Sequence, residues 1–215
     1  MKDTQIIMLG TGNAGVTRCY NTCFAIRTAE NVLLVDAGGG NGILVQLEKA
    51  GIAIERIHDM FVTHAHTDHI LGAVWVIRMV AQRMQSGKYA GVFRVYGHDK
   101  VLQVLDWICR MTLPKKIVQY LGNGIELCEV KDGETFKAGE LKLQSFDIGS
   151  TKEKQYGFRT TLSNGQSLVC LGDEPYNEKN RPYVEGADWL LCEAFCLYKD
   201  RDIFKPYEKH HSTAL

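Results

Sequence analysis

Several features common in other classes of protein are missing from this chain of 215 residues. Neither sign of charge is in excess, because Lys+Arg and Asp+Glu both number 25, so composition does not indicate a nucleic-acid or membrane-surface binder. The longest helical apolar stretch, 70–80, is interrupted by Arg78 and is shorter than a membrane span. The apolar run near the N-terminus covers only about five residues, and we therefore expect no signal peptide and no membrane association.

Cysteine is present, but the seven cysteines form no CxxC pair. An odd number of cysteines without an export signal is typical of reduced thiols packed inside a cytosolic protein. We therefore expect a cytoplasmic location and no structural zinc site made of cysteines. The chain is 45% hydrophobic, which is enough for one sizeable core, and residues 1–215 are predicted to form a single domain.

The order of the apolar patterns predicts the fold class. Short buried strands alternate with amphipathic helices in the first half, and strand patterns dominate from residue 125 onward. The strands are expected at 5–9, 23–27, 32–35, 57–62, 92–96, 125–130, within 134–147, and at 155–162, 167–171 and 188–192, and the helices at 43–50, 69–84 and 98–111. This order predicts an α/β sandwich in which helices cover two sheets.

The stretch GTGNAG at 10–15 has the GxGxxG pattern of a dinucleotide-binding loop and follows a predicted strand. Asp36 ends a later strand about twenty residues on, where a ribose-binding carboxylate would lie. A dinucleotide-dependent oxidoreductase is therefore one hypothesis, and a glycine-rich turn between two strands is the other. The oxidoreductase hypothesis explains none of the histidines that follow the fourth predicted strand.

Those histidines lie in the stretch THAHTDH at 63–69. Imidazole and carboxylate groups are ligands that zinc, manganese and iron accept. In an extended or turning segment, His64 and His66 point to the same side, and Asp68 and His69 follow as the chain turns into a helix. The spacing can therefore serve two adjacent metal ions, the first held by His64 and His66 and the second by Asp68 and His69. Burying these groups without a metal or a dense hydrogen-bond network would be unfavourable.

Together with other segments, this stretch resembles the metallo-β-lactamase superfamily and, within it, the ribonuclease Z-like branch. The matching segments are MLGTG at 8–12, LLVDAGGG at 33–40, FVTHAHTDHILG at 61–72, YGFR at 156–159, LGDEP at 171–175, CEAF at 192–195 and HHSTA at 210–214. The resemblance covers most of the chain and implies the αββα sandwich of that superfamily.

The resemblance also implies roles for individual residues. Asp173 would bridge the two metal ions together with a hydroxide, and a pair of cations brings the pKa of water toward neutrality. His211 would donate a proton to the leaving oxygen, and Glu193 would orient His211. Asp36 would hold a ligand histidine in place. We therefore take Asp68, His211 and Glu193 as catalytic residues, and add Asp173 to the four metal ligands of the THAHTDH stretch.

Two departures from the family pattern affect the metal ligands. The family has a ligand histidine shortly before YGFR, where this chain has FDIGST, so Gly149 or a neighbour takes its place. The family also continues past HST with a helix, a strand and a final ligand histidine, whereas this sequence ends at Leu215. We therefore expect a sandwich that lacks its last helix and strand, and an open edge that a homodimer would cover. We expect two divalent ions at partial occupancy, Zn²⁺ first and Mn²⁺ or Fe as alternatives, with His210 as a further candidate ligand.

The choice of substrate rests on two segments. His66 occupies a position where diiron oxygen reductases of the superfamily carry glutamate, which favours hydrolysis. Enzymes of the family that process tRNA carry a long arm between the GYR-like and GD motifs, whereas only 160–171 separates Arg159 from Gly172 here. With a neutral net charge, tRNA is not expected as the main substrate.

We therefore predict a ribonuclease Z-like metallo-hydrolase that cleaves a small phosphodiester or a short nucleic acid. A lactone or thioester hydrolase of the same fold is the alternative. A further alternative is a member of the superfamily that has lost catalysis and is retained for binding.

Overall fold

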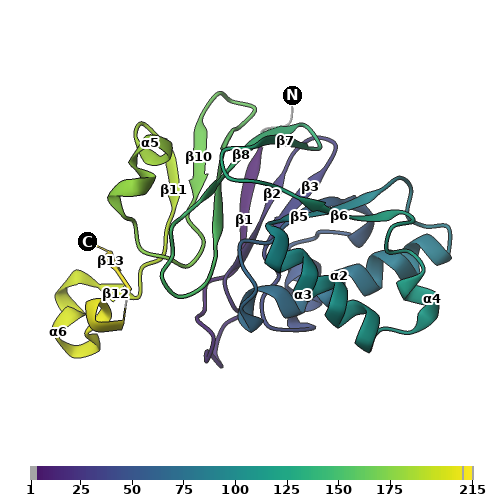
Figure 1. Cartoon of the computed structure of the whole chain (residues 1–215), viewed down its shortest axis with the longest axis horizontal. Coiled ribbons are helices and arrows are strands. Elements are labelled where there is room, and N and C mark those ends of the chain that lie inside the picture. The colour runs from purple at the N-terminus through teal and green to yellow at the C-terminus, as the bar shows by residue number, and fades with distance from the viewer. Residues whose placement is uncertain (1–3, 210, 215) are drawn as a thin grey trace. The chain divides into compact units, whose positions relative to one another are not determined.

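A computed structural model describes residues 4–209 and 211–214 of the chain (Figure 1). The backbone divides into two compact units. The first contains the described residues up to Val130 together with 137–141, and the second contains 131–136 and the described residues from Lys142 onward. That all of them belong to one domain stays a prediction. No helix in the described part of the chain combines the length and the apolar character needed to cross a membrane.

The first unit contains a six-stranded sheet in the order β1-β2-β3-β4-β5-β6. Its first three strands form antiparallel pairs, and β3, β4, β5 and β6 are parallel to one another. The strands are β1 (Gln5–Gly10), β2 (Cys23–Arg27), β3 (Val32–Val35), β4 (Ile57–Phe61), β5 (Phe93–Gly97) and β6 (Ile125–Glu129). Because β3, β4, β5 and β6 are parallel and successive strands are neighbours, the chain must cross back over the sheet between them, usually through a helix.

The helices of the first unit are α1 (Gly42–Lys49), α2 (Thr67–Gln85), α3 (Asp99–Thr112) and the short α4 (Lys115–Val118). Since parallel crossovers are right-handed and the strand order never reverses, α1, α2 and α3 lie on the same face of the sheet. Apolar side chains of all three helices join those of the strands in one buried core, among them Leu47, Ile77 and Leu105. This packing fixes where each strand ends and each helix begins.

Most of a five-stranded sheet in the order β11-β10-β9-β8-β7 belongs to the second unit. β8, β9 and β10 pair antiparallel, and β11 lies parallel to β10. The elements of this part of the chain are β7 (Thr135–Ala138), β8 (Leu141–Asp147), β9 (Tyr156–Thr161), β10 (Ser167–Cys170), α5 (Arg181–Val184), β11 (Trp189–Leu191), β12 (Cys196–Leu197), α6 (Arg201–Phe204) and β13 (Thr213–Ala214). The end of β7 and the first residue of β8 fall in the segment 137–141, which belongs to the first unit. A small core of Phe146, Ile148, Val169 and Leu171 lies beneath Tyr183, whose ring stacks on Phe146 at a centroid distance of 4.1 Å.

Each predicted strand and long helix is present, with bounds close to those expected. The sequence patterns did not predict the shortest elements, which are helices of four residues and strands of two residues, namely α4, α5, α6, β12 and β13. A segment of two to four residues is too short to show a period of 2 or 3.6, so its apolar pattern cannot reveal it.

Gly72 of α2 allows a close backbone approach that no other residue would permit. A Cβ added at this position would lie 1.7 Å from the carbonyl oxygen of Ala37, in the loop that follows β3. The Gly72 N–H also donates to the carbonyl oxygen of Gly38 at 2.8 Å. The N-terminal part of α2 is thereby held directly against the residues that follow β3.

We expect Gly72→Ala to lower the free energy of unfolding by about 3 kcal/mol, because α2 must move away from Ala37 to make room for the methyl group. Urea unfolding followed by circular dichroism measures this change. Gly15→Ala is the matched control, since a Cβ at Gly15 meets no atom within 4 Å. Equal stability of the two variants would contradict the close approach.

Candidate metal centre

The carboxylate of Asp36 organises the candidate site in the first unit. Asp36 follows β3, is 3% exposed, and has a φ of 53°, in the left-handed region that aspartate tolerates better than most residues. Its Oδ1 accepts the backbone N–H of Thr63 at 2.8 Å. Its Oδ2 accepts the Thr63 hydroxyl at 2.8 Å and lies 2.8 Å from Nδ1 of His69. One carboxylate therefore ties the loop after β4 to the start of α2.

Thr63 passes this constraint on to His64. The Thr63 hydroxyl donates its hydrogen to Asp36, so its oxygen can only accept from Nδ1 of His64, which lies 2.9 Å away. The proton of the His64 imidazole is thereby assigned to Nδ1, and the lone pair to Nε2. By the same reasoning, the contact with Asp36 places the proton of His69 on Nδ1. Both rings therefore have the tautomer whose Nε2 can bind a metal ion.

His64 and His66 direct one nitrogen each toward a common point. The segment between β4 and α2 is extended up to His66, where ψ is 148°, so the two side chains leave the backbone on the same side. Nε2 of His64 lies 3.0 Å from Nδ1 of His66. Two imidazoles on a tetrahedral zinc ion, each at roughly 2.0–2.1 Å, have their nitrogens about 3.3 Å apart. The observed spacing therefore fits two ligands of one cation.

Asp68 and His69 form a second pair in the first turn of α2. Oδ2 of Asp68 lies 3.7 Å from Nε2 of His69, and the two side chains are 14% and 2% exposed. The rings of His64 and His69 are neighbours, with centroids 4.1 Å apart. The negative charge of Asp68 is favoured at the N-terminus of a helix. The four donors of the THAHTDH stretch thus lie close together, and their role as metal ligands stays a prediction.

Burial keeps the His64 imidazole neutral. His64 is 0% exposed, and burial, assisted by the neighbouring His69, lowers its pKa from 6.5 to about 2. A neutral imidazole is the form that binds a metal ion. The folded chain therefore presents a ligand nitrogen that stays free of a second proton throughout the physiological range of pH.

Asp173 lies in the second unit, in the turn that follows β10. The side-chain amide of Gln155, which is 0% exposed, donates to Oδ1 of Asp173 at 2.7 Å and approaches Oε1 of Glu174 at 3.5 Å. Glu174 also accepts the Ser150 hydroxyl at 2.6 Å. A neutral donor between two carboxylates fixes the orientation of Asp173 and reduces the repulsion between the two acids.

Glu193 and His211 are in contact within the second unit. Nδ1 of His211 lies 3.0 Å from Oε1 of Glu193, whose other oxygen accepts the backbone N–H of Ser212 at 2.9 Å. The ring of Phe195 stacks on the imidazole at a centroid distance of 4.9 Å. With Nδ1 facing Glu193, Nε2 is the nitrogen through which His211 can transfer a proton. His210 lies outside the described residues.

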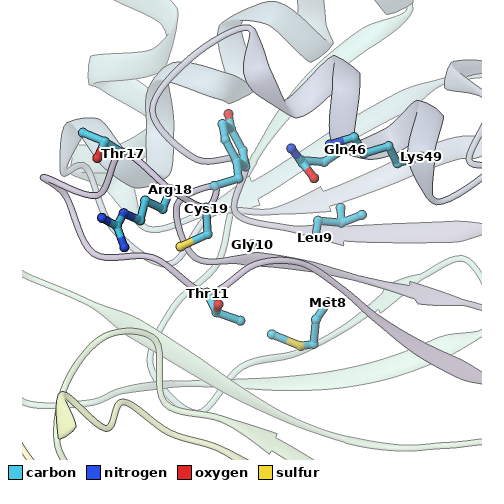
Figure 2. Close-up of a pocket in the computed structure, with 10 residues that line it drawn as sticks. Met8, Leu9, Gly10, Thr11, Thr17, Arg18, Cys19, Gln46 and Lys49 are labelled. Atoms are coloured by element: carbon cyan, nitrogen blue, oxygen red, sulfur yellow. The ribbon is translucent and has the colours of Figure 1, made fainter.

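The glycine-rich stretch does not form a dinucleotide-binding loop. No helix follows it: 11–22 form a loop in which the N–H groups of Thr11 and Gly12 donate to the carbonyl oxygen of Tyr20. Asp36 is engaged by Thr63 and His69 rather than placed for a ribose. The loop lines a pocket of about 420 Å³ together with side chains of α1, and Figure 2 shows its residues.

Two residues of the candidate site were missed by sequence reasoning. Thr63 lies within the quoted stretch, but its role as a relay between Asp36 and His64 depends on the direction of one hydroxyl hydrogen. Gln155 precedes YGFR, and nothing in the pattern distinguishes it from an ordinary polar residue. No periodic pattern in the sequence signals either role, because both depend on contacts that only the folded chain brings about.

The low pKa of His64 predicts a pH-dependent stability of the metal-free protein. Below about pH 6.5 the imidazole binds a proton in the unfolded chain but stays neutral in the folded chain. The free energy of unfolding therefore falls by roughly 2 kcal/mol between about pH 7.5 and about pH 5 because of this group alone. Urea unfolding with EDTA at several pH values measures the slope. His64→Asn should show a shallower slope, and equal slopes for the two proteins would contradict the neutral state.

Comparison with known proteins agrees with the fold and the motifs. The chain matches the family described as Anti-Pycsar protein Apyc1 over residues 4–194. It is 36% identical over 258 aligned positions to a ribonuclease Z of Thermococcus gammatolerans, an alignment that covers 97% of this chain and 77% of the relative.

Two solved structures are similar at the level of the fold. Human tRNase Z, short form, aligns with a TM-score of 0.74 and 19% identity, over 97% of this chain and 83% of that one. A diphosphatase from the PhnP family aligns with a TM-score of 0.72 and 19% identity, over 99% of this chain and 78% of that one. The predicted superfamily and fold are confirmed. The chain belongs to the metallo-β-lactamase superfamily, to its ribonuclease Z-like branch of metallo-hydrolases, and to the family described as Anti-Pycsar protein Apyc1.

Proposed function

We propose that the protein is a metal-dependent phosphodiesterase that acts on phosphodiesters smaller than tRNA. The convergence of His64 Nε2 and His66 Nδ1 on one point, with the tautomer of His64 set through Thr63 and Asp36, is the observation that carries this proposal. Two relatives named for ribonuclease Z activity and a diphosphatase of the same fold make a phosphorus ester the best supported class of substrate.

The donor set fits divalent cations. Three imidazoles and two carboxylates, those of His64, His66, His69, Asp68 and Asp173, are ligands suited to zinc, with manganese or iron as alternatives. In this proposal His64 and His66 would hold one ion, Asp68 and His69 would hold a second, and Asp173 would be available as a ligand to both. When bound, such ions supply a water of lowered pKa and offset the charge of the phosphoryl oxygens.

The other residues of the chain handle protons and orientation. In hydrolysis a water oxygen forms a bond to phosphorus, the bond from phosphorus to the leaving oxygen breaks, and that oxygen takes a proton. His211 is the donor in our proposal, with Glu193 holding the ring so that Nε2 faces the leaving oxygen. The proton lost by the attacking water restores His211, so the reaction consumes only water. Asp36 keeps two ligand histidines in the required tautomer.

The connection between β9 and β10 supports a small substrate. Residues 160–171 consist of the ends of these two strands and the tight turn at Gly165, whose φ is 85°. The segment therefore contains no arm of the kind that would extend over a tRNA, and the chain has no excess of positive charge to attract a polyanion. Its length suits a substrate that is recognised close to the reacting phosphorus.

The test combines metal analysis with an activity assay. We expect protein purified without chelator to contain zinc by mass spectrometry, and to hydrolyse bis(p-nitrophenyl) phosphate after addition of Zn²⁺ or Mn²⁺. EDTA should abolish turnover, and either His66→Ala or Asp68→Ala should lower kcat/KM by about a thousandfold or more, because each removes a metal ligand. Turnover that survives both substitutions would exclude the proposed role of the metal.

His58→Gln is the matched control, because His58 contacts Tyr89 at the start of β4 and belongs to neither donor pair. It should keep wild-type metal content and activity. A γ-thiolactone and an aryl thioester, assayed in parallel, test the alternative substrate class, and preference for either over the phosphodiester would overturn the choice of phosphorus ester. Metal binding without any turnover would instead indicate a degraded member of the family.

A further inference from the structure

The second unit contains a cavity of about 400 Å³ that includes His211 in its wall. Its other lining residues include Gly149, Glu174, Tyr176, Lys179 and Tyr207. All of these belong to the second unit, so the cavity is complete within it. Its position beside the proposed proton donor raises the question of what it holds.

Because His211 lines this cavity, its proposed role as proton donor indicates which part of a substrate would enter. A general acid must lie within hydrogen-bond reach of the oxygen that it protonates. In our proposed function that oxygen belongs to the leaving group, and His211 is the donor. The space that His211 lines is therefore the space next to the leaving group, rather than next to the part of the substrate that stays on phosphorus.

Gly149 contributes to the room available. Its φ is 74°, a conformation that residues with a side chain rarely adopt. A Cβ placed there would lie 3.5 Å from Cδ and 3.9 Å from Nζ of Lys179, so the lysine side chain runs directly beside the bare backbone. At the position where the family resemblance led us to expect a ligand histidine, this chain thus has a glycine with a lysine side chain beside it.

Charge gives the cavity little selectivity. The lining contains the ammonium group of Lys179 and the carboxylates of Glu174 and Glu178, so charges of both signs are present and largely offset one another. Glu174 is moreover held by Ser150 and Gln155. Recognition of a leaving group here must therefore rest mainly on shape and on apolar contact.

Two tyrosine rings provide that contact. Tyr176 and Tyr207 both line the cavity, and they are 40% and 57% exposed, which is high for aromatic side chains. The hydroxyl of Tyr207 is fixed by Thr213 at 2.9 Å, so its ring has a defined orientation. Exposed rings beside a cavity bind flat partners by stacking, which contributes about 1–3 kcal/mol for each ring.

We propose that this cavity is the leaving-group subsite, and that Tyr176 and Tyr207 make the enzyme prefer phosphodiesters whose leaving alcohol carries a flat aromatic ring. The proposal rests on the proposed function, because it takes His211 as the proton donor. Beyond the proposed function, it names the residues that select the substrate, and it says that they act on the leaving-group side of the phosphorus.

Two substrates separate the two sides of the phosphorus. Bis(p-nitrophenyl) phosphate has a ring on both sides, whereas methyl p-nitrophenyl phosphate has a ring only on the leaving side. We expect Tyr176→Ala and Tyr207→Ala each to raise KM by about 5-fold or more for both substrates, with kcat changed by less than about 2-fold. Tyr176→Phe and Tyr207→Phe keep the ring and should keep the wild-type KM.

Tyr198→Ala is the control, because Tyr198 is 45% exposed but packs on Arg201 rather than lining the cavity. It should leave KM unchanged for both substrates. A loss confined to bis(p-nitrophenyl) phosphate would place the tyrosines on the non-leaving side and overturn the proposal. Unchanged KM in both alanine variants would overturn it as well.

Failure of the proposed function is distinguishable from failure of the subsite. If the metal-loaded wild type does not turn over, the proposed function fails, and the dissociation constant of methyl p-nitrophenyl phosphate from calorimetry replaces KM. Weaker binding by the alanine variants, with unchanged binding by the phenylalanine variants, would then still support the subsite. Equal binding by all of them would exclude it.

Discussion

The hydrogen bonds accepted by the Asp36 carboxylate are the constraint on which the candidate metal centre depends. Asp36 follows β3, and its own N–H donates to the carbonyl oxygen of Phe61 at the end of β4, while the next N–H, of Ala37, donates to His69 in α2. Its side chain then binds Thr63 and His69. One residue in a left-handed conformation therefore connects two strand ends and a helix start, and the cost of that conformation is offset by bonds that orient the ligands.

The same geometry explains how a buried cluster of imidazoles remains stable without a cation. Nε2 of His64 and Nδ1 of His66 are close enough to share either a proton or a metal ion. A shared proton satisfies both nitrogens in the metal-free chain, and a cation replaces it when one binds. Because two ligands of one tetrahedral zinc ion lie about 3.3 Å apart, a cation that took the place of this proton would require only a small change in the spacing of the two nitrogens. The low pKa of His64 belongs to this arrangement, since burial excludes a second proton.

Much of the fold and part of the site follow from local patterns in the sequence. The period of the apolar residues predicted the strands and long helices, and the spacing of His64, His66, Asp68 and His69 predicted two neighbouring pairs of donors. The roles of Thr63 and Gln155 were not predictable, because a hydrogen-bond direction and a contact across many residues leave no periodic trace. The GxGxxG stretch misled because its pattern records glycines and not the conformation of the residues after them, which here fold back onto Tyr20.

The two units of the chain supply different parts of the proposed activity, and this division bears on how specificity arises. The first unit provides four of the proposed metal ligands, and metal ions act on the phosphoryl group that all phosphodiesters share. The second unit provides the proposed proton donor and a cavity with two exposed rings. Metal ligands are constrained by coordination geometry, whereas the lining of a leaving-group cavity is not. Gly149 lies where the family resemblance predicts a ligand imidazole, so this position bears on both proposals: glycine offers no donor atom, and its lack of a side chain leaves Lys179 beside the bare backbone.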